Sequence, residues 1–106
     1  MKWIKQSLAP GLASFGVLAY LKGDYEKSVS RIERAFDWVP QLNEMPVYSG
    51  YLGLSLLKVG KAIEAQLHLE KSLGGFNKLA FIDKDEKEIN AELKKEIENA
   101  LQVFKT

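Results

Sequence analysis

The chain has 106 residues, of which 46% are hydrophobic and 27% charged, and its formal net charge is +1. This length is typical of one domain with its own core, and the near-neutral charge gives no electrostatic reason to expect nucleic acid or an anionic membrane as a partner. The chain contains no cysteine, which excludes disulfides and thiolate metal sites, and nothing in the composition indicates an oxidising compartment.

The N-terminal region combines two lysines, Lys2 and Lys5, with an apolar stretch over residues 8–21. This stretch is interrupted by Pro10, is too short to cross a bilayer and is not followed by a small-residue cleavage pattern. We therefore expect neither a signal peptide nor a membrane span, and a cytoplasmic location is the default expectation. Residues 1–8 are expected to form a short amphipathic segment that covers the first pair of helices.

Residues 9–42 are expected to form a first helical hairpin. Pro10 suits the first turn of a helix, where its missing N–H is not needed, and Gly23 is well placed to end that helix. Asp24 is a natural N-cap for the second helix, because its carboxylate can accept hydrogen bonds from free N–H groups. Apolar residues then recur at helical spacing as far as Pro40, which ends the helix.

Residues 46–79 are expected to repeat this plan. Pro46 opens a helix that runs through Lys58, and Gly60 separates it from a partner helix over residues 61–73. The Gly74–Gly75 pair then predicts a C-terminal stop. The segment that follows, residues 76–82, is apolar and is expected to be an irregular link packed against the body of the protein.

Residues 83–104 are expected to form a long final helix. Asp83 and Glu86 are suitably spaced for a capping box at its start. Its apolar residues fall on one stripe, whereas the other face carries lysine and glutamate: Ile89, Leu93, Ile97, Ala100, Leu101 and Phe104. Because no glycine interrupts this helix, it is predicted to be a cap on the exposed end of the array and not a third hairpin.

The two predicted hairpins share a spacing of small residues. Three small residues separated by 12 and then 7 positions occur in each hairpin, with an offset of 37 between the sets: Gly16, Ser28 and Ala35, then Gly53, Ala65 and Ser72. Small residues in phase with glycine turns favour helices packed closely in pairs, one pair stacked on the next. The sequence therefore predicts an all-α helical repeat, a class of fold that ordinarily binds other proteins.

These residues resemble the tetratricopeptide repeat over residues 9–79. The first hairpin also matches through its turn, Leu21–Tyr25, and through Pro40. The second hairpin keeps Gly60 but has Ala62 where the first has Tyr25, and Asn77 where the first has Pro40. The resemblance implies two stacked helix–turn–helix hairpins in a right-handed superhelix, with residues 83–104 as the capping helix.

The resemblance further implies a concave groove lined by the first helix of each hairpin. By position, eight residues belong to this groove: Ala13, Val17, Tyr20 and Leu21 from the first hairpin, and Val47, Tyr51, Leu54 and Lys58 from the second. The face is apolar and aromatic with a single charge, so the expected ligand is an amphipathic helix or an extended apolar peptide. An apolar stripe at helical spacing is also typical of a core, and the chain's own terminal segments or a second copy could cover this face.

The predicted function is noncatalytic protein–protein interaction, as an adaptor or assembly subunit that binds a protein or peptide through this groove. The alternative is a homodimer formed through the groove or through the C-terminal stripe of Ile89, Leu93, Ile97, Leu101 and Phe104. The sequence contains no nucleophile elbow, phosphate loop or dinucleotide fingerprint, and His68 is its only histidine. We therefore expect no enzymatic activity, no cofactor and no metal site.

Overall fold

The computed structural model describes residues 2–78 and 84–105, and the side chains of residues 7–77 and 91–104. Within these ranges the chain forms five α-helices and two short 3-10 helices, and no strand. The elements follow in the order α1 (Lys2–Leu21), α2 (Tyr25–Trp38), η1 (Pro40–Glu44), α3 (Pro46–Lys58), α4 (Ala62–Lys78), α5 (Lys84–Gln102) and η2 (Val103–Lys105). The all-α prediction is confirmed.

The predicted turn residues occupy the ends of helices. Gly23 and Gly60 both have left-handed backbone conformations, with φ of 85° and 88°, which glycine adopts without steric penalty. The Asp24 carboxylate accepts a hydrogen bond from the Lys27 backbone N–H at 3.4 Å and caps α2. Pro46 is the first residue of α3, as its position in the sequence predicts.

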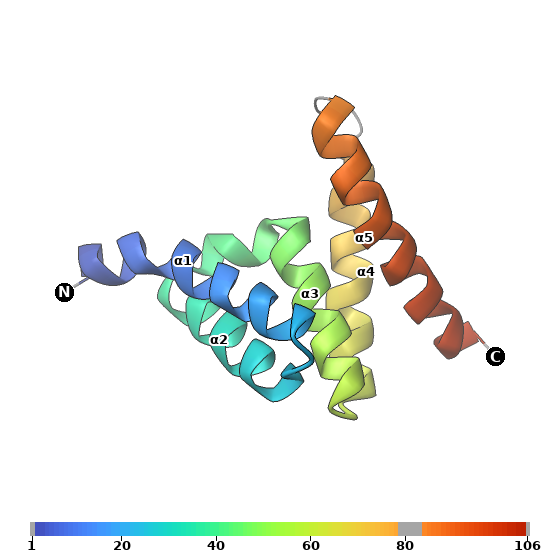
Figure 1. Ribbon diagram of the computed structural model, residues 1–106, viewed down its shortest axis with the longest axis horizontal. Helices are drawn as coiled ribbons and strands as arrows, with labels where there is room; N and C mark the ends of the chain where they lie inside the picture. Colours follow the sequence, from blue (N-terminus) through green and yellow to red (C-terminus); the bar gives the residue numbers. More distant parts are fainter. Residues whose placement is uncertain (1, 79–83, 106) are drawn as a thin grey trace.

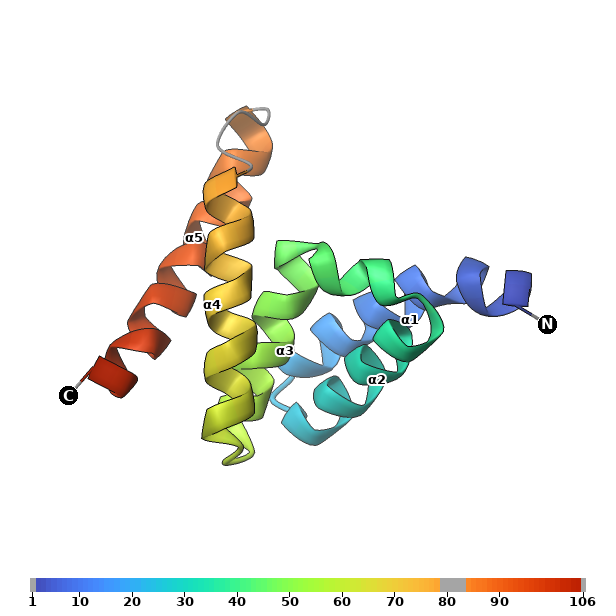
Figure 2. The same ribbon diagram turned by 180° about the vertical axis from the view of Figure 1, so that it is seen from behind.

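The helices pack as two hairpins, α1 with α2 and α3 with α4 (Figure 1). The α3 helix packs against both helices of the first hairpin, and α5 packs against both helices of the second. Views from opposite sides show α3 lying between the first hairpin and α4, with the two ends of the chain at opposite ends of the molecule (Figures 1 and 2). This arrangement is compatible with a helical hairpin repeat.

Two of the small residues lie where helices within a hairpin approach each other closely. A Cβ atom built on Gly16 of α1 would lie 2.5 Å from Cγ1 of Ile32 on α2. One built on Gly53 of α3 would lie 2.7 Å from Cγ of Leu69 on α4. The same contact therefore recurs in both hairpins, and a side chain at either glycine would require Ile32 or Leu69, or the helix that carries it, to move.

The first helix begins earlier than the sequence predicts. It starts at Lys2 and continues through Pro10, whereas the prediction placed a separate segment over residues 1–8 and a new helix from Pro10. Proline removes one backbone hydrogen bond but does not prevent a helix that packing holds in place. Ala9, directly before Pro10, is completely buried together with Ala13, which anchors this part of the helix. The side chains of Trp3 and Ile4 lie outside the described residues.

The fourth helix continues beyond the glycine pair that was expected to end it. It extends to Lys78, so the predicted stop at Gly74–Gly75 is wrong. Gly75 serves a close approach instead, because a Cβ there would lie 2.6 Å from Cγ of Pro46. Phe76 is consequently a buried helical residue and not part of an irregular link. Residues 79–83, with the predicted Asp83 cap, lie outside the described residues.

The core of the described part of the chain consists of three apolar clusters. One joins the two hairpins to α5 and contains Tyr20, Leu54, Leu69, Phe76, Leu93, Ile97 and Leu101. A second joins α2 to the second hairpin and contains Val29, Ile32, Leu52, Leu56 and Ala65. The third lies within the first hairpin and η1 and contains Ala9, Ala13, Ala35 and Leu42.

Candidate functional site

The groove predicted from the sequence is filled by α5. Tyr20 and Leu54, from the first helices of the two hairpins, are buried in one cluster with Leu93 and Ile97 of α5. Val47 and Tyr51 pack against the same cluster and are partly buried. The chain therefore places its own amphipathic helix where a peptide ligand was expected.

A hydrogen bond and two ring contacts accompany this packing. The Tyr20 hydroxyl donates to the Glu96 carboxylate on α5. The Tyr20 ring also contacts the rings of Tyr25 and Tyr51, with centroid separations of 5.4 and 5.3 Å. Burial, and then the hydrogen bond to Glu96, raise the pKa of Tyr20 well above its usual value, and burial also raises the pKa of Tyr51. Both hydroxyls therefore stay protonated at neutral pH.

The other four predicted groove residues do not join this cluster. Ala13 is completely buried within the first hairpin, and Val17 is partly buried. Leu21 and Lys58 are exposed, and the Lys58 ammonium lies 5.8 Å from the centre of the Tyr25 ring. The structure thus brings only Tyr20, Val47, Tyr51 and Leu54 together, beneath α5.

The C-terminal stripe is used within the chain. Leu93, Ile97 and Leu101 are buried against the two hairpins, and Phe104 packs beside them. The Ile89 side chain lies outside the described residues. In this arrangement the stripe is not free to contact a second copy.

An exposed apolar face on α1 is the main feature that the sequence analysis missed. Leu8, Phe15 and Leu18 recur at helical spacing along one side of α1 and are 55%, 59% and 48% exposed. Gly11 lies between them, and a Cβ there would have no neighbour within 4 Å. We call these four residues the α1 outer face. No charged residue interrupts the sequence from residue 8 to residue 21.

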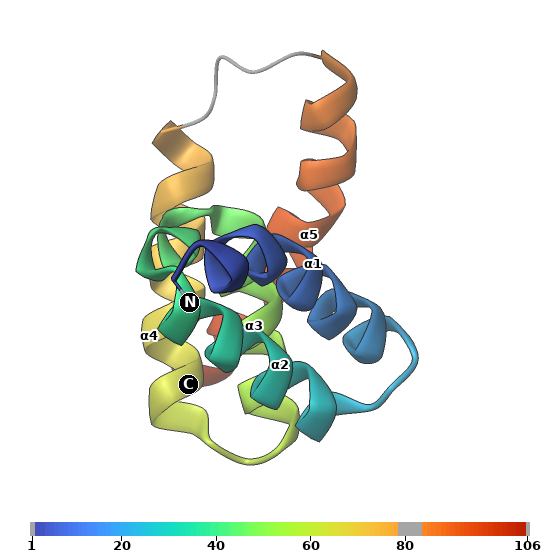
Figure 3. The same ribbon diagram turned by 90° about the vertical axis from the view of Figure 1, so that its left-hand side faces the viewer.

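The side of the molecule that carries the first hairpin is seen in Figure 3, where α1 and α2 lie toward the viewer. Monomeric proteins rarely leave several large apolar side chains exposed together unless the patch binds something. A smaller exposed pair, Ile63 and Leu67 on α4, is 81% and 65% exposed but is flanked by charged residues such as Glu64. The α1 outer face is therefore the stronger candidate for a docking surface.

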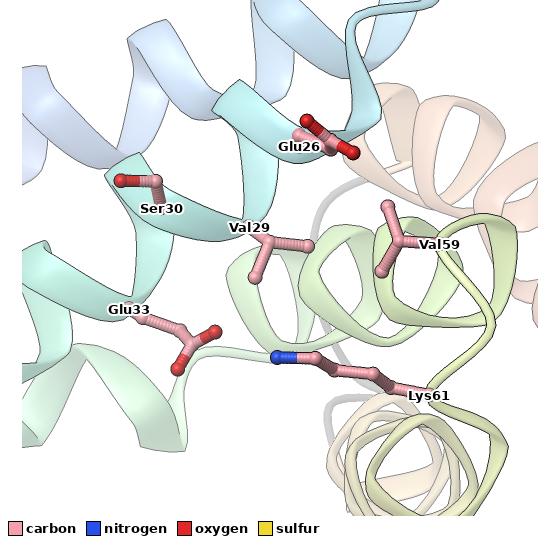
Figure 4. A pocket seen from close by; sticks show the side chains of 6 residues that line it. All are labelled: Glu26, Val29, Ser30, Glu33, Val59 and Lys61. Atoms are coloured by element: carbon pink, nitrogen blue, oxygen red, sulfur yellow. The ribbon is translucent and has the colours of Figure 1, made fainter.

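A shallow pocket of about 400 Å³ lies between α2 and the turn that joins α3 to α4. Val29 and Val59 supply its apolar part, and Figure 4 shows Lys61 extending its ammonium group toward the side of Glu33. Glu26 and Ser30 complete the lining. The lining combines two carboxylates, one ammonium and one hydroxyl, but in the described structure the Ser30 hydroxyl is hydrogen-bonded to neither carboxylate, so the pocket does not present a paired nucleophile and base.

His68 lies half-buried on α4. Burial, and then the nearby Lys71 charge, lower the pKa of His68 below its usual value, so the imidazole is neutral at pH 7. Within the part of the chain that the structure describes, no three His, Cys, Asp or Glu residues are grouped so that they could hold a metal ion. A search of the described helices finds none with the length and apolar character needed to cross a membrane.

Comparison with known proteins identifies no relative. No protein-family model matches the sequence, and no curated protein or solved structure shows significant similarity to it.

Proposed function

We propose that this chain is a noncatalytic protein–protein interaction module that docks a partner through the α1 outer face. The observation that carries the proposal is the half-exposure of Phe15 and Leu18, together with Leu8, on a stretch of α1 that has no charged residue of its own. Docking a protein there would remove the remaining exposed half of these apolar side chains from water, which favours association. The open space at Gly11 leaves room for a side chain of the partner.

The groove is a weaker candidate because α5 already occupies it. A peptide binding there would have to displace Leu93 and Ile97 from the core and break the Tyr20–Glu96 hydrogen bond. The same argument counts against a homodimer formed through the groove or the C-terminal stripe. Either interface would first require α5 to detach from the two hairpins of its own chain.

The resemblance to the tetratricopeptide repeat supports the same class of function. The repeated close approaches at Gly16 and Gly53 and the left-handed Gly23 and Gly60 are features that this resemblance implies. A right-handed superhelix of two such hairpins, capped by α5, would be a rigid scaffold for presenting α1. As a module of this kind, the chain would need neither a cofactor nor a catalytic group.

Site-specific photocrosslinking tests the proposal. A photoreactive amino acid replaces Leu18 in one variant and Ile63, the control, in another, and each variant is irradiated in cells of the source organism. We expect one discrete protein adduct from position 18, which disappears when Phe15→Glu is added, and none from position 63. Absence of an adduct at position 18, or an adduct that survives Phe15→Glu, would contradict the proposal. Both positions are exposed, so circular dichroism should show unchanged folding.

A further inference from the structure

Three of the four residues of the α1 outer face correspond to residues of α3 that face the first hairpin, whereas the fourth, Leu8, corresponds to Met45, which precedes α3. The offset of 37 that relates the two hairpins pairs Gly11 with Tyr48, Phe15 with Leu52 and Leu18 with Ser55. The inference below rests on the proposed function and concerns the kind of partner that this face receives.

On α3, these three positions contact the first hairpin. Leu52 is 1% exposed and belongs to the cluster that contains Val29 and Ile32 of α2. The Ser55 hydroxyl is fully buried and donates to the Ser28 hydroxyl of α2 at 2.8 Å. Tyr48 packs on the apolar cluster inside the first hairpin, and its hydroxyl lies 3.5 Å from Oγ of Ser14. This face of α3 is therefore its stacking surface toward the preceding hairpin.

On α1, the equivalent surface carries larger apolar side chains at two positions, and the Arg31 guanidinium of α2 donates to the Phe15 backbone carbonyl beside it at 3.5 Å. Phe15 replaces Leu52 and Leu18 replaces Ser55, yet both are about half exposed. Gly11 replaces Tyr48 and leaves open space where α3 has an aromatic ring. The α1 outer face thus has the same place on the first hairpin as the α3 surface that contacts α2 has on the second hairpin. A helix that lies on α1 as α2 lies on α3 would cover it.

We infer that the α1 outer face receives the second helix of a helical hairpin in a partner protein, packed as α2 packs on α3. The partner helix should carry β-branched apolar residues opposite Phe15, in the places of Val29 and Ile32. Opposite Leu18 it should carry alanine and not serine, because a leucine side chain cannot form the hydrogen bond that Ser55 forms with Ser28. A large apolar side chain should lie over Gly11.

In a second copy of this chain, the described helix faces that could take the place of the partner helix are already covered. The face of α2 that carries Ser28, Val29 and Ile32 is buried under α3. On α4, the equivalents of Ser28 and Ile32, Ala65 and Leu69, are buried within the second hairpin and beneath α5. Two copies could still meet with α1 against α1, or with α1 against the exposed Ile63 and Leu67 of α4, and either arrangement would be visible as a dimer.

The test uses the full chain and a helix-stabilised, fluorescently labelled peptide of residues 24–39 that carries Ser28→Ala. Fluorescence anisotropy should show saturable binding. The double variant Phe15→Glu/Leu18→Glu of the full chain should weaken binding about tenfold or more, because two buried contacts become buried charges. The control Ile63→Glu/Leu67→Glu changes a still more exposed apolar pair on α4 and should leave binding unchanged.

Two peptide variants sharpen the result. The peptide with serine at position 28 should bind more weakly than the alanine version, because its hydroxyl would be buried against Leu18 without a partner. A peptide with Val29→Glu and Ile32→Glu should not bind. Equal binding of the serine and alanine peptides, or binding that ignores the Phe15→Glu/Leu18→Glu change, would overturn the inference, as would no binding at all.

Light scattering over a wide concentration range, without peptide, completes the test. A monomer agrees with the inference. A dimer that disappears with Phe15→Glu/Leu18→Glu would make a second copy the occupant, which would overturn the inference but leave the proposed docking function intact. If the peptide does not bind but position 18 gives a crosslink, the inference is overturned and the proposed docking function stands. Failure of both the peptide and the crosslink would remove the proposed function as well.

Discussion

Tyr20 on α1 donates a hydrogen bond to Glu96 on α5, which lies 76 residues further along the chain. This contact joins the first hairpin to the C-terminal helix. It lies beside the apolar cluster that both hairpins share with α5, to which Tyr20 itself belongs. It identifies α5 as an integral part of the fold, because the helix interacts with both hairpins and not only with the one that precedes it.

Removing the Tyr20 hydroxyl should destabilise the protein. Tyr20→Phe keeps the ring in the cluster but deletes the hydrogen bond to Glu96, so the free energy of unfolding should fall by about 1 kcal/mol. Urea unfolding monitored by circular dichroism measures the change. Tyr48→Phe is the control, because its hydroxyl makes only a long, exposed contact of 3.5 Å. Equal losses in the two variants would show that the Tyr20–Glu96 bond has no special role.

The stability of the protein should also fall at alkaline pH through Tyr20. Burial and the bond to Glu96 raise the pKa of Tyr20 in the folded state above its usual 10.0. Above about pH 10 the unfolded chain loses a proton that the folded chain keeps, so this contribution is complete below pH 10 and is lost as the pH rises further. Tyr20→Phe should therefore flatten the fall in stability above about pH 10. Parallel pH curves for the wild type and the variant would contradict the prediction.

The glycines at the helix crossings should tolerate no side chain. Gly16→Ala would place a Cβ 2.5 Å from Ile32, and we expect a loss of about 1–3 kcal/mol in stability. Gly74→Ala is the matched control, because a Cβ there meets nothing within 4 Å and residue 74 lies inside α4. It should stabilise the protein by about 0.5–1 kcal/mol, since alanine is the better helix former. Thermal melting of both variants checks the prediction, and a destabilised Gly74→Ala would count against the described path of α4.

The buried serine pair offers a double-mutant cycle. Ser28→Ala or Ser55→Ala alone leaves the other hydroxyl buried without its partner, and each should lower stability by about 1–3 kcal/mol. The double variant should lose less than the sum of the two single losses, because no unpaired hydroxyl remains. Chemical denaturation of the four proteins measures the coupling. Additive losses would mean that the two hydroxyls do not depend on each other.

A substitution in the C-terminal stripe should lower the stability of the single chain and not the affinity between two copies. Ile97 is completely buried between α5 and the second hairpin, so Ile97→Ala should lower stability by about 2–5 kcal/mol at every protein concentration. An unfolding midpoint that rises with protein concentration in the wild type but not in the variant would instead indicate that the stripe joins two copies. Glu98→Ala, on the exposed side of the same helix, should leave stability nearly unchanged.

The sequence by itself determined the features that depend on local geometry. The turns at Gly23 and Gly60, the Asp24 cap and the start of α3 at Pro46 were all predictable, because each requires a particular residue type at one place in the backbone. The repeated spacing of small residues likewise predicted the close helix crossings.

Only the tertiary structure decided which apolar surfaces are covered. The C-terminal stripe was visible in the sequence. Its periodicity indicates that one face of the helix is buried, but it does not indicate which surface covers that face. Gly75 shows the same limit: whether a glycine ends a helix or permits a close contact depends on what lies opposite, here Pro46. The α1 helix is apolar nearly all round, so its sequence could not distinguish the side packed on α2 from the side that carries Phe15 and Leu18. That distinction depends on how the hairpins stack, which is set by contacts between residues far apart in the chain.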